Sequence, residues 1–473
     1  MSALRRRSRA KVLILVILLL LLAVVGTVSY LGWRQSIAGP SVMTPPPRRL
    51  GHKTTFPVVI EARRGNITAA EVGIVQDGRS TVVAKADGPP GARAELAVTV
   101  DSAALELREG EGTLVVRARD DFWRPLAIDE RPFATFPVTL DFTPPQLEIL
   151  AATRYVSNGG VGLVAFRVDG ASSTDVTVGG STAPSFPMGP PERRARVALV
   201  VLPWDLAPGA PIAVRARDDA GNVTTRGIPF ELRPRQFPRD TIDVTNNFLQ
   251  TKVPELLPQH PPSTPLIEGF LVLNRDQRRQ AEEEKRRIAA KTADRPLWEG
   301  PFVQPRNTKV FANFAETRRY LYQGQEVDTQ VHFGYDLAST KQAPVPAANK
   351  GVVVFAGPLT IYGNTVIVDH GIGLQTLYAH LSSISVKAGD QVDKGQELGR
   401  TGTTGLVLGD HLHYEVLVHG VPVTPVEWWD AKWMRDRINL PLGAAGLPEI
   451  AGLDASAAED RAARPGRSER RRR

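Results

Sequence analysis

The hydrophobic positions of this chain follow two different patterns along its length. Residues 12–31 form an almost continuous apolar run, interrupted only by a few residues such as Gly26 and Thr27. A helix of that length spans about 30 Å, the thickness of a bilayer core, so the run predicts one transmembrane helix. Beyond residue 50, apolar and polar residues alternate in short runs bounded by Gly and Pro, which is typical of β-strands. The pattern predicts a mainly β protein behind an N-terminal transmembrane helix.

The charges beside the apolar run indicate an orientation. Residues 1–11 carry a basic cluster, and Arg34 is the only nearby charge after the run. Because basic residues favour the cytoplasmic side of a membrane helix, we expect residues 1–11 in the cytoplasm and the bulk of the chain outside. A cleavable signal peptide is the alternative, but the run is long for one and no clear A-x-A cleavage signal follows. The first interpretation predicts a single-pass protein of the cytoplasmic (inner) membrane, with its C-terminal domain in the periplasm or an equivalent space.

An internal repeat divides the middle of the chain. Residues 116–121 read Val-Arg-Ala-Arg-Asp-Asp, and residues 214–219 repeat the same letters about 98 positions later. That offset is about the size of one β-sandwich module. The repeat predicts two Ig-like β-sandwiches, at 50–143 and 144–235. We expect the paired aspartates to lie in turns with solvated carboxylates; calcium binding is the alternative.

Residues 236–298 change composition and predict a linker with a charged helix. A Pro-rich stretch precedes Asn274 and Gln277, whose spacing resembles a capping box and predicts a helix start. Pairs at i,i+4 spacing, such as Glu282 with Arg286, are typical of a solvated helix. We therefore expect a spacer helix, with a basic partner-binding helix as the alternative.

Composition narrows the classes of function. The chain has 473 residues and no cysteine, so an exported protein must rely on ordinary cores, and thiolate ligands and cysteine nucleophiles are excluded. Much of its net charge of +8 lies at the two ends, including residues 449–473, whose lack of periodicity predicts a disordered, Arg-rich tail. Nucleic acid is not an expected partner, because no nucleic-acid motif is present. Anionic wall polymer and the cytoplasmic membrane are the expected acidic partners.

Histidines and a carboxylate in short strands supply the candidate chemistry. His411 and His413 alternate in an apolar run, so a strand places both on one face. His332 and Asp336 are four positions apart, and a bend at Gly334 would let both reach one ion. Zinc accepts these ligand types readily, whereas two surface histidines are the alternative for the first pair taken alone.

Six short motifs, in order over residues 299–430, resemble a LytM-type zinc metallopeptidase domain of the M23 peptidase family. The motifs are His332-x-x-x-Asp336, Tyr362-Gly363-Asn364, Tyr378-Ala379-His380-Leu381-Ser382, Gly389-Asp390-x-Val392-x-x-Gly395-Gln396, Gly402-Thr403-Thr404-Gly405 and His411-x-His413. The resemblance covers a little over a quarter of the chain. It implies a metallopeptidase domain at 299–440, built as a mostly antiparallel β-sheet with the metal in a groove on its face.

The resemblance also implies roles for five residues. His332, Asp336 and His413 match the zinc ligands of the family, with one zinc ion per domain and a water in the fourth position. His380 and His411 match its two other histidines, which move protons beside that water in an order that the sequence leaves open.

The implied function is a membrane-anchored zinc endopeptidase that hydrolyses peptide cross-links of peptidoglycan outside the cytoplasmic membrane. The Ig-like modules would then bind wall, an envelope protein partner or the catalytic domain itself. A non-catalytic scaffold that activates a separate cell-wall amidase is the alternative, and the complete set of five residues argues against it.

Overall fold

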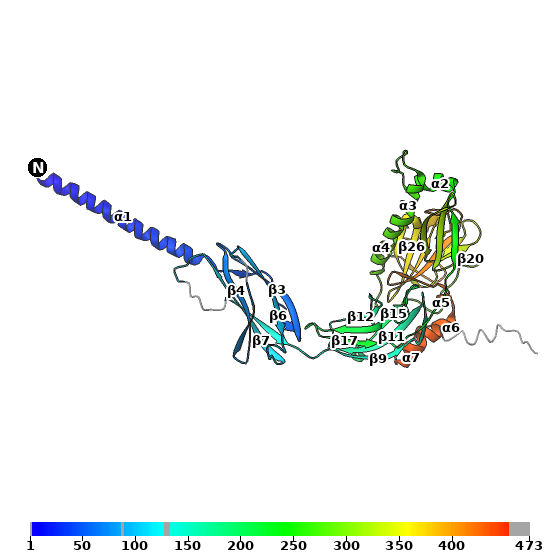
Figure 1. The fold of residues 1–473 in the computed structure, drawn as a ribbon, viewed down its shortest axis with the longest axis horizontal. Helices are drawn as coiled ribbons and strands as arrows, with labels where there is room; N and C mark the ends of the chain where they lie inside the picture. The colour runs from blue at the N-terminus through cyan, green and yellow to red at the C-terminus, as the bar shows by residue number, and fades with distance from the viewer. Residues whose placement is uncertain (1, 87–88, 127–132, 454–473) are drawn as a thin grey trace, which may run out of the picture. The chain divides into compact units, whose positions relative to one another are not determined.

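A computed structural model of the chain describes residues 2–86, 89–126 and 133–453. These residues form two compact units, one of residues 2–144 with 217–223 and one of residues 145–216 with 224–453 (Figure 1). Strands outnumber helices in both, which confirms the predicted mainly β class. The predicted start of the disordered tail at residue 449 is wrong, because Ile450 and Leu453 are buried in the core of the second unit; from residue 454 onward the tail lies outside the described residues.

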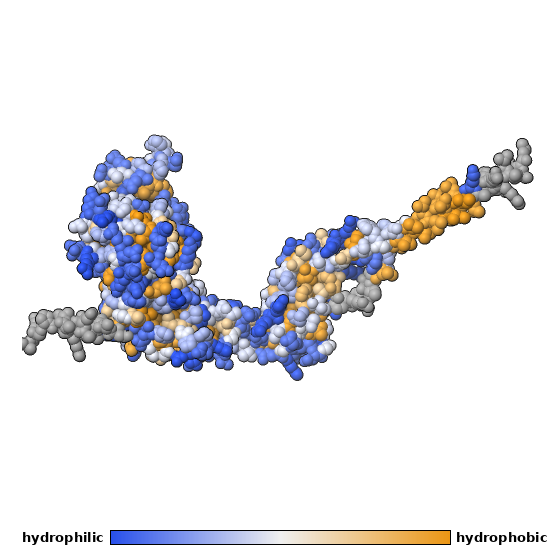
Figure 2. Space-filling view, turned by 180° about the vertical axis from the view of Figure 1, so that it is seen from behind, coloured by the Kyte–Doolittle hydropathy of each residue, from blue (hydrophilic) through white to orange (hydrophobic). Residues whose placement is uncertain are grey.

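The first unit begins with helix α1 (Ser2–Ser36). Within it, Lys11–Ser36 is long and apolar enough to cross a membrane. Figure 2 shows a continuous hydrophobic surface along the visible side of this helix, and its aliphatic side chains from Val12 to Val28 are exposed. A helix that is apolar around its circumference suits a lipid environment, in agreement with the predicted membrane span.

Two sheets follow α1 and enclose one hydrophobic core, to which Val58 and Leu114 contribute from opposite sheets. The first sheet, in the order β1-β3-β6, contains β1 (Ser41–Val42), β3 (Lys53–Glu61) and β6 (Arg93–Asp101). The second, in the order β2-β8-β7-β4-β5, contains β2 (Arg49–Leu50), β4 (Ile67–Gln76), β5 (Arg79–Lys85), β7 (Gly110–Asp120) and β8 (Ala134–Leu140). This is a β-sandwich arrangement; its Ig-like character stays a prediction.

The second unit starts with two four-stranded sheets. One has the order β14-β15-β11-β9, from β9 (Gln146–Ala152), β11 (Val161–Asp169), β14 (Phe186–Pro187) and β15 (Ala195–Val201). The other has the order β13-β12-β16-β17, from β12 (Ser173–Val178), β13 (Ser181–Pro184), β16 (Ile212–Arg217) and β17 (Val223–Gly227). β11 is apolar at successive positions because its two faces enter different cores, Leu163 on one side and Val164 on the other.

The predicted metallopeptidase region forms an eight-stranded sheet in the order β20-β23-β31-β27-β26-β25-β29, with β32 beside β31. Its strands are β20 (Lys309–Ala312), β23 (Tyr335–Ala338), β25 (Gly351–Pro358), β26 (Asn364–Gly371), β27 (Leu374–Ala379), β29 (Gln391–Val392), β31 (Leu412–Val418) and β32 (Val421–Val423). All pairings in this sheet are antiparallel, as expected. Two three-stranded sheets flank it: β19 (Arg239–Asp243), β21 (Glu316–Tyr322) and β22 (Gln325–His332), and β24 (Pro344–Pro346), β28 (Ser383–Ile384) and β30 (Glu397–Arg400).

The region expected to be a linker packs against this sheet. It holds α2 (Asn246–Leu256), α3 (Leu266–Leu271), a π-helical stretch (Val272–Gln277) and α4 (Arg278–Ala289), and Figure 1 shows α4 running alongside β26. The helix start predicted at Asn274 is wrong: the helical stretch begins at Leu266. Asn274 is buried, and its side-chain amide donates to Asp328. The side chain that was expected to cap the helix therefore makes a tertiary contact instead.

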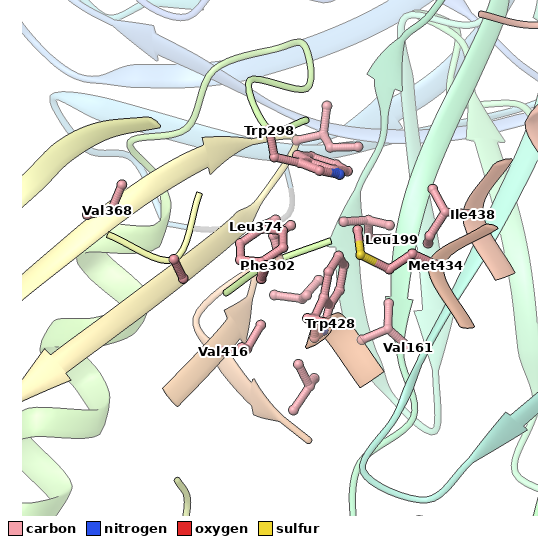
Figure 3. Packing of buried hydrophobic residues seen from close by; sticks show 14 of the residues in the cluster. Val161, Leu199, Trp298, Phe302, Val368, Leu374, Val416, Trp428, Met434 and Ile438 are labelled. Carbon is pink, nitrogen blue, oxygen red and sulfur yellow. The ribbon is translucent and has the colours of Figure 1, made fainter. Parts of the chain in front are cut away.

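A single hydrophobic core joins the β9–β17 sandwich to the eight-stranded sheet (Figure 3). Val161 and Leu199 enter from the sandwich, and Trp428 enters from α5 (Val426–Trp429) between the two. The short helices that follow, α6 (Ala431–Met434) and α7 (Leu440–Ala444), close the same core. The sandwich is therefore a fixed support for the sheet that carries the candidate site.

Candidate active site

Three of the predicted residues meet where β22, β23 and β31 come together. Asp336 on β23 is paired directly with His413 on β31, and His332 is the last residue of β22. Nε2 of His332 lies 3.0 Å from Oδ1 of Asp336 and 3.0 Å from Nδ1 of His413, and that Nδ1 lies 2.9 Å from the same Oδ1. The chain bends between β22 and β23 at Gly334, so the predicted convergence is present in the structure.

The hydrogen bonds around the two imidazoles indicate which ring nitrogens carry lone pairs. Nδ1 of His332 lies 2.9 Å from the Asn313 carbonyl oxygen, and Nε2 of His413 lies 2.9 Å from Oε1 of Glu415. Because these oxygens accept, both nitrogens carry hydrogen, and in the neutral rings the lone pairs are on His332 Nε2 and His413 Nδ1. Both lone pairs therefore face Asp336.

This donor set fits a metal ion. Among the described residues, His332, Asp336 and His413 form the only group of His, Cys, Asp and Glu side chains close enough to share one. Ligand atoms of a tetrahedral zinc site stand roughly 3.3 Å apart, given zinc–ligand distances near 2.0 Å, and the three atoms here are 2.9–3.0 Å apart. Two nitrogens and one carboxylate are also a ligand combination that zinc accepts.

The electrostatics of the site favour positive charge at the same point. Burial alone would raise the pKa of Asp336, but when the neighbouring imidazoles are protonated, the charge of His332 and the hydrogen bonds that these rings then donate hold this pKa well below its ordinary value. Burial likewise lowers the pKa of His413, but Asp336 and Glu415 on either side of the ring outweigh it and raise this pKa. An ionised carboxylate between imidazoles therefore attracts a cation, either a proton or a metal.

Each candidate ligand is held by a further group on its far side. His332 contacts the Asn313 carbonyl, as described above. Oδ2 of Asp336 lies 3.1 Å from the Arg318 guanidinium, which leaves Oδ1 to face the imidazoles. His413 contacts Glu415, which is fully buried. Such outer contacts orient metal ligands and fix the tautomers of histidine ligands.

His380 and His411 lie beside this group, as the sequence predicted. Their rings are 5.1 Å apart, and the His380 ring is 5.7 Å from that of His413. Nδ1 of His380 donates to the Thr404 carbonyl and Nδ1 of His411 to the Gly409 carbonyl, so in the neutral rings the lone pair is on Nε2. Nε2 of His411 lies 3.4 Å from Oδ1 of Asp336. Burial, with the charges of His411 and His413, holds the pKa of His380 well below its ordinary value. A neutral His380 can accept a proton.

The five residues face one cavity of about 370 Å³. Its walls include residues from far upstream, among them Asp240 and Asp243 of β19 and Phe270 of α3. Phe311 packs edge-on against the His411 ring, and Leu408 stands exposed at the same cavity. The cavity thus combines apolar walls with converging polar groups, which is typical of a binding site.

The sequence interpretation missed the groups behind the ligands: Lys285, Arg318 and Glu415. Glu415 gave a signal, because it is the one charged residue in β31, whose positions are all buried. A buried carboxylate requires a partner, and that partner, Lys285, lies on the helix expected to be a solvated spacer.

Comparisons with known proteins agree with this site. Residues 330–425 match the family described as Peptidase family M23, so the chain contains an M23 peptidase domain and the predicted resemblance is confirmed. Over 97 residues it is 44% identical to the DD-carboxypeptidase/endopeptidase Mpg of Neisseria meningitidis serogroup B, which covers 20% of this chain and 22% of that protein. Over 96 residues it is 44% identical to the peptidoglycan DD-endopeptidase ShyA of Vibrio cholerae serotype O1, with the same coverage. The chain thus spans less than a quarter of the length of these relatives.

Among solved structures, the catalytic domain of the antimicrobial peptidase lysostaphin from Staphylococcus simulans is 28% identical and covers 26% of this chain and 92% of that one, with a TM-score of 0.23.

Proposed function

We propose that this chain is a zinc metallo-endopeptidase that hydrolyses peptide cross-links of peptidoglycan outside the cytoplasmic membrane. The observation that carries the proposal is the meeting of three lone-pair atoms, from His332, Asp336 and His413, with His380 and His411 in the same cavity. The M23 domain and the relatives named as endopeptidases support the substrate class.

The side chains divide into those that hold the metal and those that handle protons. His332 Nε2, Asp336 Oδ1 and His413 Nδ1 would hold zinc. When bound there, zinc supplies Lewis-acid chemistry: it polarises a carbonyl and makes a water more acidic. The neutral His380 ring has its lone pair on Nε2, and this nitrogen accepts a proton from the water whose oxygen bonds to the peptide carbonyl carbon. The carbon–nitrogen bond then breaks, and the leaving nitrogen takes up the proton that His380 accepted. His411, in the same cavity, is the second histidine that could pass on this proton, once protonated at Nε2.

Helix α1 supports a location of the catalytic domain outside the cytoplasm. We assign Lys11–Ser36 as a single-pass anchor in the cytoplasmic membrane, with the basic residues before it inside and the sheets of both units outside. Export places the active site where its proposed substrate is found. Protease added to spheroplasts should digest the second unit, and full protection in intact spheroplasts would contradict this orientation.

The first β-sandwich is proposed to bind wall or an envelope protein partner. The first sandwich has its own core, whereas the β9–β17 sandwich shares one with the catalytic sheet. Deleting the first sandwich should therefore disturb the catalytic sheet less than deleting the second. Deletion of residues 50–143 should change localisation or wall cleavage while leaving zinc content intact. Unchanged behaviour of that deletion would contradict a binding role.

Metal analysis and wall digestion test the central proposal directly. The full chain, purified in detergent, should contain about one zinc per molecule and release peptide-linked fragments from isolated wall sacculi, identified by mass. His332→Ala and His413→Ala should lose both properties, whereas His52→Ala, a histidine of the first unit, should keep both. Full wall digestion by His413→Ala would show that the site is not catalytic.

A further inference from the structure

Helix α4 carries a lysine into the interior of the protein. Lys285 is fully buried, and its ammonium lies 2.7 Å from Glu282 Oε1, 2.8 Å from Glu415 Oε2 and 2.9 Å from the Tyr362 hydroxyl. An ammonium group has three hydrogens, so each one has an acceptor. Burial of a lysine is costly unless the charge is paired and hydrogen-bonded, which indicates that this arrangement is specific.

The same contacts continue to the metal site. Glu415 is fully buried, and while Oε2 faces Lys285, Oε1 lies 2.9 Å from His413 Nε2. Tyr362 adds a second contact to Oε1 at 2.8 Å, so both carboxylate oxygens are fixed. With its Nε2 held in this way, the His413 ring presents Nδ1 to Asp336.

Several contacts fix α4 against the sheet so that Lys285 is held in place. Ile288 of α4 packs in one core with Ile367 of β26 and Leu377 of β27. Gly420, in the turn between β31 and β32, lies so close to the helix that a β carbon there would be 2.8 Å from the Arg286 Cα. The segment after the helix is also held in place, because the Ala293 amide donates to the carboxylate of Asp369 in β26.

We propose that Lys285 is a positioning residue for the metal ligand His413, acting through Glu415. Lys285 lies outside residues 330–425, the part of the chain that matches the M23 family, so this support is supplied by the upstream helix. The inference rests on the proposed zinc site. It makes α4 a structural part of the metal centre rather than a spacer.

Zinc affinity tests this role without a measurement of catalysis. The full chain in detergent is stripped with EDTA and titrated with zinc against a chromogenic chelator, and the melting temperature of each metal-free form is recorded. Lys285→Met, which removes the charge but keeps the length, should weaken zinc binding by about 10–100-fold, the usual effect of losing an outer partner.

Two control variants separate a positioning role of Lys285 from a general loss of helix packing. Ile288→Ala loosens the same helix without touching Glu415, so it should lower the melting temperature and leave zinc affinity within twofold of the wild type. Arg287→Met, on the exposed side of α4, should change neither. If Lys285→Met does not fold, Lys285→Gln, which keeps a donor, takes its place in the same titration.

The outcomes are distinct. Zinc affinity of the Lys285 variant within twofold of the wild type, or tighter, overturns the inference while the proposed function stands. An equal loss of affinity in Ile288→Ala also overturns it, because helix packing alone would then explain the effect. Failure of the wild type to bind zinc would instead overturn the proposed function.

Discussion

A β carbon at position 334 would lie 2.7 Å from both Cε1 and Nε2 of His413. The Tyr414 carbonyl oxygen would be equally close, at 2.7 Å, so the new atom would meet a ring on one side and backbone on the other. The ring cannot retreat freely, because its Nε2 is held by Glu415. The absence of a side chain at Gly334 therefore allows the bend between β22 and β23 to bring His332 and Asp336 to His413.

Gly334→Ala tests this relationship. The added methyl group should displace the His413 ring and weaken zinc binding by about 10-fold or more, with a loss of stability of about 1–3 kcal/mol from overpacking. Chelator competition measures the first effect and thermal melting of the metal-free protein the second. Gly227→Ala is the control, because a β carbon there would meet nothing within 4 Å. Wild-type zinc affinity in Gly334→Ala would show that the ring can move without loss.

Substitution of His380 should affect turnover without affecting metal binding. Because it contacts the site without being one of the three ligand residues, His380→Ala should keep its zinc but lose about 10²–10⁴-fold in kcat, the usual contribution of a general base. Zinc content and sacculus digestion are measured on the same preparation. Loss of zinc together with activity would assign His380 to the metal rather than to proton transfer.

The pH profile gives a second measurement of His380. A base must be neutral to accept a proton, and burial with the charges of His411 and His413 lowers the pKa of His380 below its ordinary value of 6.5. Activity should therefore persist as the pH falls through 6.5, and the acidic limb of kcat/KM should lie below that value. An acidic limb above pH 6.5 would contradict the assignment of His380 as the base.

The sequence predicted the strands and the residues of the candidate site because both depend on local pattern. β25, β26, β27 and β31 are alternating or continuous apolar runs bounded by glycine, and the structure places them as expected. The motifs supplied the histidines and the aspartate that the structure brings together, because their spacing along neighbouring strands is what makes them converge. The bend at Gly334 was predictable for the same reason.

The contribution of α4 could not be predicted from local pattern. Its buried residues are Ala281, Lys285, Ile288 and Ala289, so the expected apolar stripe holds two small residues and a charged one. Pairs such as Glu282 with Arg286 therefore led to the prediction of a solvated helix, although Glu282 contacts Lys285 in the structure. The presence of Lys285 in the buried stripe is explained only by its tertiary partner, the carboxylate of Glu415, which is 130 residues away in the sequence.

Glu427 predicts a dependence of stability on pH. It lies on α5, close enough to Gly160 that a β carbon there would be 2.8 Å from its Oε1, and its Oε2 has no hydrogen-bond partner among the described residues. Burial raises the pKa of Glu427 to about 8 from an ordinary 4.5, despite the hydrogen bond from the Val161 backbone and the charges of Arg235 and Arg437. At neutral pH the folded protein therefore keeps a proton that the unfolded chain has lost.

Between about pH 4.5 and pH 8 this group binds more protons in the folded state, so the free energy of unfolding should fall as the pH rises through that window and then level off. The contribution is on the order of 3–5 kcal/mol. Glu427→Gln should be more stable than the wild type at pH 8 and close to it at pH 4.5. Melting temperatures across the range measure this, with the exposed Glu397→Gln as control. Parallel profiles for the wild type and Glu427→Gln would contradict the raised pKa.

The packing of the β9–β17 sandwich against the catalytic sheet should depend most on Trp428. It is fully buried, with its ring centroid 6.4 Å from that of Trp298 and 5.6 Å from that of Phe302, in the core that also holds Val161 of the sandwich. Trp428→Ala leaves a large cavity there and should cost about 3–5 kcal/mol of stability. The candidate metal ligands lie on β22, β23 and β31 rather than on α5, so zinc affinity measured at low temperature should stay near the wild-type value.

Calorimetry and limited proteolysis together test that prediction. The melting temperature should drop, and the segment that links the sandwich to β19, residues 234–238, should become susceptible to cleavage because the two parts no longer share an intact core. Leu440→Ala, at a leucine of α7 that is 68% exposed, is the control for removing a large apolar side chain from the same helical segment. A wild-type melting temperature in Trp428→Ala would mean that the sandwich and the sheet are held together by other contacts, such as the hydrogen bond between Thr153 and the Arg437 carbonyl.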